Sequence, residues 1–210
     1  MLKMIFPCIL ILCVITQHAN CQNTKTAHYF GEPIFTDSLS TLFIPLRYNQ
    51  EFMSDNKIAF WGDYYANLLV YDYTADSYRK LFEKDTYIEA FKINTPYRYN
   101  QGVNPQPKNI TREWVFLLVK TTDYNNSGRI DEKDPSILYA TTPKGERLKA
   151  LTNETEHVVS IELFEKQGFG LIKIQRDINN SKSFTYADKD FYYRKINLPD
   201  LTLGKAIEIK

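Results

Sequence analysis

The sequence predicts an all-β protein, and three observations support this prediction. The 210-residue chain is rich in strand-forming residues, with fifteen Tyr, thirteen Phe and an aromatic content of 14%. Apolar and polar residues alternate with the two-residue period of a half-buried strand, and beyond the N-terminus no segment has a helical period. A strand–turn–strand pattern also recurs three times, which is typical of a protein built from repeated β-units.

Each repeat contains a predicted β-hairpin with two candidate strands before it. The hairpins pair residues 68–73 with 78–82, 137–140 with 147–151, and 191–196 with 206–209. The strands before them are expected at 42–48 and 57–61, at 87–93 and 114–120, and at 158–164 and 171–175. The chain therefore divides into three four-stranded antiparallel units, at about residues 41–83, 86–152 and 157–210.

A four-stranded antiparallel unit resembles one blade of a β-propeller. Closed propellers have about four to eight blades, so three units would form an open or partial propeller. They could equally form half of a ring that a second copy completes as a homodimer, and a β-sandwich built from the same strands is the alternative fold. A polar insertion at residues 94–111 interrupts the second unit, where long loops are either functional or plain connectors.

The N-terminus predicts export. Lys3 is followed by an apolar run at residues 5–15 and by a polar, small-residue exit that ends at Cys21, as in a signal peptide. Residues 1–21 are the predicted signal peptide and residues 22–210 the β-repeat domain, located in the periplasm, at the cell surface or outside the cell. The alternative is a lipoprotein, in which cleavage before Cys21 leaves a lipid on that thiol as the single membrane attachment.

The charge pattern excludes one class of partner. The formal net charge is +1, and Lys and Arg are scattered along the chain instead of forming a basic stripe. A nucleic-acid-binding protein normally carries such a stripe, so no nucleic-acid partner is expected.

The most specific chemical pattern is a twelve-residue loop at residues 123–134. Calcium takes about six to eight oxygen ligands, and oxygen-bearing side chains recur here with the spacing of an EF-hand loop. Gly128 stands at the sixth position, where the chain turns sharply, and Ile130 at the eighth would anchor the loop to the core. The expected calcium ligands are Asp123, Asn125, Ser127, the backbone carbonyl of Arg129, Asp131 and Asp134.

Two features limit this expectation. Asp134 stands at the last position, where Glu is usual, so we expect modest affinity and competition from magnesium. Strands on both sides favour a structural ion over a helix–loop–helix sensor. The alternative interpretation is a polar turn that only joins two strands.

A second, degenerate copy of the loop follows at residues 177–188. Its first, third, fifth and last positions still carry oxygens, and Phe184 takes the apolar eighth position. Lys182 replaces the glycine, and its charge is unfavourable to a bound cation, so strong calcium binding is not expected there.

The first loop, the strand at 137–139, the turn at 143–145 and the strand at 148–152 together resemble the calcium-loop blades of TolB-like propeller repeats in exported bacterial proteins. The resemblance extends from about Trp114 to the C-terminus. It implies a propeller-like fold and a binding or scaffolding role, and it implies no enzyme activity.

Catalytic patterns are missing from the sequence. His28 and His157 are far apart, no nucleophile or nucleotide motif occurs, and all three cysteines precede residue 22. Asp63 and Asp72 are the best candidates for a glycosidase pair, although turn and strand-edge roles explain them better. The chain is therefore not expected to be an enzyme.

These observations predict an exported, non-catalytic calcium-binding module with a protein or glycan partner. A binding surface could be formed by the aromatic residues Trp61, Tyr64, Tyr65, Tyr71 and Tyr73, which ordinary sheet packing would also explain. The alternative function is a surface lipoprotein subunit that recognises a carbohydrate or another envelope component.

Overall fold

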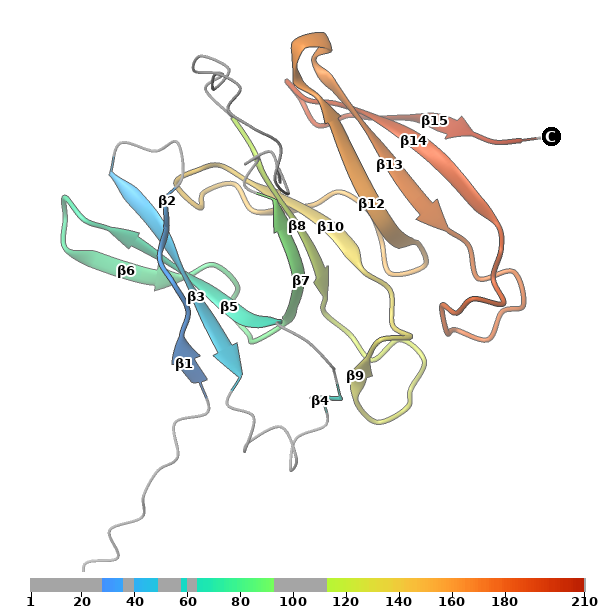
Figure 1. Cartoon of the computed structure of the whole chain (residues 1–210), viewed down its shortest axis with the longest axis horizontal. Coiled ribbons are helices and arrows are strands. Elements are labelled where there is room, and N and C mark those ends of the chain that lie inside the picture. Colours follow the sequence, from blue (N-terminus) through green and yellow to red (C-terminus); the bar gives the residue numbers. More distant parts are fainter. Residues whose placement is uncertain (1–27, 36–39, 49–57, 60–63, 93–112, 210) are drawn as a thin grey trace, which may run out of the picture.

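The computed structural model describes residues 28–35, 40–48, 58–59, 64–92 and 113–209. These residues form strands and turns, and their only helical segment is the short 3-10 turn η1 (Glu165–Gln167). The prediction of an all-β fold is therefore confirmed (Figure 1).

The larger sheet has nine strands, and its main path runs β1-β3-β5-β7-β8-β10-β11, with β2 beside β3 and β6 beside β5. Its strands are β1 (His28–Phe30), β2 (Ile34–Phe35), β3 (Thr41–Tyr48), β5 (Tyr65–Asp72), β6 (Ser77–Lys80), β7 (Tyr87–Lys92), β8 (Val115–Lys120), β10 (Ile137–Thr141) and β11 (Lys149–Ala150). All neighbours are antiparallel, but β5 and β7 share the single residue pair Tyr65–Ile88. The sheet thus consists of two groups joined at one point: the β1–β6 group, which contains β1, β2, β3, β5 and β6, and the β7–β11 group, which contains β7, β8, β10 and β11.

The C-terminal sheet is a four-stranded antiparallel meander. Its strands β12 (His157–Phe164), β13 (Phe169–Gln175), β14 (Phe191–Asn197) and β15 (Leu203–Ile207) follow in chain order. The strands expected in the second and third repeats, outside the insertion, are therefore confirmed. The insertion at 94–111 lies outside the described residues.

The β7–β11 group lies in the middle of the molecule and is buried on both faces. Alternate residues of β8 point to opposite sides, so one set contacts the β1–β6 group and the other contacts the C-terminal sheet. The first cluster contains Phe43, Leu68, Val70, Leu81, Phe82, Ile88, Val115, Leu117 and Val119. Burial of each large side chain contributes about 1.5–3 kcal/mol.

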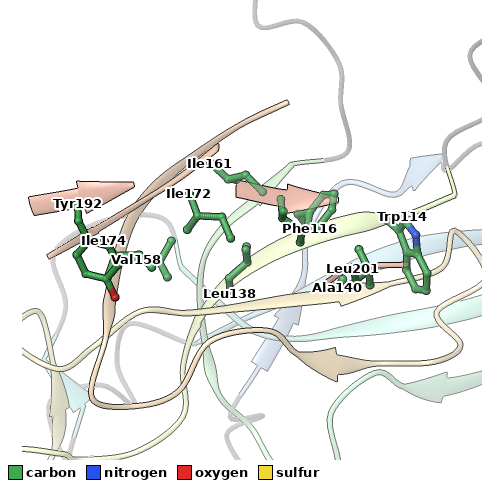
Figure 2. Packing of buried hydrophobic residues seen from close by; sticks show 11 residues of the cluster. Trp114, Phe116, Leu138, Ala140, Val158, Ile161, Ile172, Ile174, Tyr192 and Leu201 are labelled. Atoms are coloured by element: carbon green, nitrogen blue, oxygen red, sulfur yellow. The ribbon is translucent and has the colours of Figure 1, made fainter. Parts of the chain in front are cut away.

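The second cluster fills the layer between the middle group and the C-terminal sheet. Figure 2 shows Phe116 and Leu138 of the middle group close to Ile161 and Ile172 of the C-terminal sheet. Trp114 and Leu201 extend the cluster, and the two sheets therefore stack face to face.

The first repeat differs from its prediction. The strand expected at 57–61 is not the partner of the first hairpin, because β3 pairs directly with β5 over Thr41–Asp72 to Arg47–Tyr65. Instead β4 (Ile58–Ala59) forms a parallel pair with β9 (Ile130–Asp131), and the rest of 57–61 lies outside the described residues. The group begins earlier than expected, at β1, because His28–Phe30 pairs with β3.

Candidate metal site

The predicted calcium loop connects β8 to β10, the second and third strands of the middle group. The loop at 177–188 makes the same connection in the C-terminal sheet, between β13 and β14. Both loops therefore emerge at the same end of the stacked sheets, near β9 in Figure 1.

The corresponding connection in the first group runs from β3 to β5, at residues 49–64. The strands expected at 57–61 and 68–73 leave only residues 62–67 for this place, and the structure corrects this expectation because residues 65–67 belong to β5. Within this connection, Ile58 pairs with Ile130, the eighth residue of the first loop.

The start of the first loop is organised by the Asp123 carboxylate. Its Oδ1 accepts the N–H of Ser127 at 2.9 Å, and its Oδ2 accepts the N–H of Gly128 at 2.8 Å. Asn125 Oδ1 lies at 2.9 Å from the same Ser127 nitrogen. These bonds place the oxygens of Asp123 and Asn125 on one side of a tight turn, as a ligand ring requires.

Ser127 and Arg129 extend this set of oxygens. Ser127 Oγ lies 3.5 Å from Asp123 Oδ1 and donates to the backbone carbonyl of Arg129 at 3.0 Å. Asp131 Oδ1 accepts the N–H of Lys133 at 2.9 Å. The turn needs positive φ values at Asn126 and Gly128, of 58° and 93°, and glycine adopts this conformation without steric cost.

Asp134 differs from the other expected ligands because it is fully buried and closes the loop. Its Oδ1 accepts the N–H groups of Tyr124 and Asn125, at 2.9 and 3.3 Å, and its Oδ2 accepts that of Asp131 at 2.7 Å. Burial raises the pKa of the Asp134 carboxyl above its ordinary value, against the three N–H groups that lower it. Both oxygens therefore have partners, unlike those of a bidentate metal ligand.

A buried lysine supports the end of the first loop through hydrogen bonds to its backbone carbonyls. Lys120 Nζ donates to the backbone carbonyls of Asp134 and Glu132 and to Ser136 Oγ, and it pairs with Glu89 at 3.3 Å. Burial lowers the pKa of this ammonium, and the Glu89 carboxylate opposes that shift. Lys120 was not among the residues expected at the site, although a lysine at the end of an apolar strand is a signal of a buried partner.

The second loop has the same backbone design as the first. Asp177 Oδ1 and Oδ2 accept the N–H groups of Ser181 and Lys182 at 3.0 and 2.7 Å, and Asn179 Oδ1 accepts that of Ser181 at 2.8 Å. Asn180 and Lys182 have positive φ values of 55° and 58°. Gln175 Nε2 supports this loop, donating to the carbonyls of Thr185 and Asp188 at 2.7 Å each.

The two loops contact each other through Phe184. Its N–H donates to the carbonyl of Lys133 in the first loop at 2.8 Å. Its ring stacks on Tyr124 and His157, with centroid distances of 6.3 and 5.4 Å. The apolar eighth residue of the second loop is therefore anchored on the first loop.

The chemistry of the first loop fits calcium better than a transition metal. Among the described residues, no three His, Cys, Asp or Glu side chains form a group that could hold a metal ion, and this finding includes the carboxylates of Asp123, Asp131 and Asp134. The oxygens of the loop come instead from carboxylates, an amide, a hydroxyl and a backbone carbonyl, which are donors that calcium prefers.

Other sequence candidates are separated by the fold. Tyr64 packs with the buried pair Tyr48 and Tyr87, whereas the exposed Tyr73 lies in the turn that follows β5. Asp72 closes that turn by accepting the N–H groups of Thr74 and Ala75, at 2.9 and 3.0 Å. Tyr65 and Tyr71 lie on β5, whereas Trp61 and Asp63 lie outside the described residues.

The two histidines also have separate roles. His28 pairs with Asp85 at 3.1 Å, and His157 Nδ1 accepts the N–H of Ser136 at 3.1 Å. Burial, with a smaller contribution from the Lys120 charge, lowers the pKa of His157 to about 4.

Comparison with known proteins leaves the family open: no protein-family model and no curated protein sequence matches this chain. Across the described residues, no helix has the length and apolar character needed to cross a membrane.

Proposed function

We propose that this chain is an exported, non-catalytic β-repeat protein that binds calcium in its first loop and serves as a binding or assembly module. The observation that carries this proposal is the Asp123 carboxylate, which orders the turn through Ser127 and Gly128 while oxygens of Asn125, Ser127 and Arg129 gather beside it. Asp123, Asn125, Ser127, the Arg129 carbonyl and Asp131 would hold the ion, and water would complete its coordination.

The role of Asp134 in this proposal is to close the loop. Because its two oxygens accept three backbone N–H groups, it fixes the start of the loop against its end. A bound ion would offset the repulsion among Asp123, Asp131 and Asp134, and binding would therefore stabilise the fold.

The stacking of the strand groups supports the assembly role. The four strands of the C-terminal sheet follow in chain order, and the middle group is covered on both faces. The outer face of the C-terminal sheet has no such cover within the described structure and exposes Phe191 and Tyr193 at 40% and 41%. The protein partner of the proposed assembly role would pack there.

The test is calcium titration of the exported form, residues 22–210, by calorimetry, together with thermal melts in calcium and in chelator. We expect saturable binding and a higher melting temperature in calcium, and we expect Asp123→Ala to abolish the tighter binding and its stabilisation. Asp72→Ala is the matched control, because Asp72 orders a turn outside both loops through similar N–H bonds. Equal calcium stabilisation of the wild type and Asp123→Ala would contradict the proposal.

A further inference from the structure

The second loop contains a buried carboxylate oxygen without a partner. Asp188 is fully buried, and its Oδ1 has no hydrogen-bond donor among the described residues. A buried carboxylate oxygen without a donor is costly, and such groups in folded proteins are satisfied by water or by an ion.

The orientation of this oxygen follows from comparison with the first loop. Asp188 Oδ2 accepts the N–H of Thr185 at 3.1 Å, just as Asp134 Oδ2 accepts that of Asp131 at 2.7 Å. One oxygen of each carboxyl group is therefore held alike, and by analogy with Asp134 we infer that Asp188 Oδ1 faces the start of its own loop. In the first loop that oxygen has two N–H partners, and in the second it has none.

The remaining oxygens of the second loop are arranged for the same ion. Asp177 and Asn179 share the Ser181 N–H, and Ser181 Oγ donates to the carbonyl of Ser183 at 3.2 Å. Thr185 occupies the ninth position, with its hydroxyl 3.3 Å from Asp188 Oδ2. This set is less charged than the first loop, because Thr185 replaces the carboxylate of Asp131.

The charge of Lys182 is the main feature that opposes a cation here. Its ammonium lies over the Tyr124 ring of the first loop, 6.0 Å from the ring centroid. Within the described structure it forms no ion pair with a carboxylate of its own loop. The charge would therefore weaken cation binding without occupying the ring of oxygens.

We propose that the 177–188 loop is a second calcium site, weaker than the first, in which Asp188 Oδ1 is a ligand together with the oxygens of Asp177, Asn179, Ser181 and Ser183. The ion supplies the partner that the buried Asp188 oxygen lacks. Magnesium is a poorer fit, because it demands near-ideal octahedral geometry and gives up its water reluctantly.

The experiment separates the two loops by removing the first site. Calcium is added to Asp123→Asn, and the backbone amide resonances of residues 177–188 are followed by NMR. We expect saturable shifts of these resonances at about millimolar calcium, in the range of weak extracellular sites. Asp177→Asn in the same background should abolish the shifts, and Asp72→Asn is the control outside both loops.

A second variant tests the proposal through a gain of binding. Lys182→Gly removes the opposing charge and restores the glycine of the first loop, so calcium should bind the second loop about tenfold more tightly. Unshifted amides in both Asp123→Asn and Asp123→Asn/Lys182→Gly would show that Asp188 Oδ1 takes only water, and would overturn the proposal.

The outcome for each site is independent. If the second loop responds and Asp123→Asn binds as much calcium as the wild type, the first site fails and the second stands. If Asp123→Asn loses the tighter binding and the second loop never responds, the first site stands and the second fails.

Discussion

The two twelve-residue loops have the same backbone path but different chemistry. In both, an aspartate at the first position accepts the N–H groups of the fifth and sixth residues, and the fourth and sixth residues have positive φ. The first loop rests on the buried Lys120, and the second rests on the neutral Gln175. The shape of such a loop is therefore set by its internal hydrogen bonds, whereas its charge balance is set by the residues around it.

The largest expected effect concerns Lys120 and Gln175, the two residues that support the loops. Lys120→Met would leave Glu89 without its ammonium partner and two loop carbonyls without a donor, so we expect a loss of about 3–5 kcal/mol in the free energy of unfolding. Gln175→Leu removes only neutral hydrogen bonds, and about 1–3 kcal/mol should be lost. Urea denaturation measures both, and equal losses would show that the charge of Lys120 is unimportant.

His157, which stacks on Phe184 where the two loops meet, should make the stability of the protein sensitive to acid. In the folded protein its pKa is lowered to about 4 from the ordinary 6.5, so the unfolded chain binds the proton first as the pH falls. Above pH 6.5, His157 is neutral in both the folded and the unfolded chain and costs no stability. By pH 4, its protonation in the unfolded chain should lower the free energy of unfolding by about 3 kcal/mol.

Urea denaturation at pH 7, 5.5 and 4.5 measures this loss, and His157→Gln is the matched control. Gln is neutral at each of these pH values, and its side-chain oxygen can still accept the Ser136 N–H. All other titrating groups are the same in the two proteins. The variant should therefore lose less stability on acidification, and parallel pH curves for the two proteins would contradict the assignment.

The final aspartates should respond unequally to the same substitution. Asp134→Asn replaces one carboxylate oxygen by an N–H₂ group, which faces one or two backbone N–H groups, and about 2 kcal/mol should be lost in chelator. Asp188→Asn leaves one oxygen for Thr185 and removes the unpartnered one, so its cost in chelator should be below about 1 kcal/mol. Thermal melts in chelator measure both losses, and a larger loss for Asp188→Asn than for Asp134→Asn would contradict the expected difference between the two aspartates.

The smallest effect is expected at the sixth position. Gly128 and Lys182 both have positive φ, which costs a residue with a Cβ atom about 1 kcal/mol relative to glycine. In chelator, Gly128→Ala should therefore destabilise the protein by about 1 kcal/mol, and Lys182→Gly should stabilise it by a similar amount. No atom lies within 4 Å of a Cβ added at Gly128, so the loss would reflect backbone conformation alone.

Local patterns predicted much of the site as well as the strands. The spacing from Asp123 to Asp131 and its repeat at Asp177 indicated two related turns, and both turns are present. The pattern could not show that Asp134 Oδ1 accepts backbone N–H groups while Asp188 Oδ1 has no donor, because the spacing of residues in a sequence does not fix the distances between individual atoms.

The first repeat shows a second limit of sequence reasoning. An apolar segment around Ile58 resembles a strand of the hairpin sheet, yet it pairs with Ile130 in the loop of the next group. Alternation identifies a segment that can pair, but it does not identify its partner.

The sequence by itself determined that the protein is built from antiparallel β-units and that two of its connections carry turns rich in oxygen-bearing side chains. Both properties depend on residues close together in the chain, through alternation and through hydrogen bonds within a few residues. Only the tertiary structure decided that the middle group is buried on both faces, that Lys120 supports the first loop and that Phe184 joins the two loops. These features depend on contacts between distant segments, whose energy is gained only when the sheets stack.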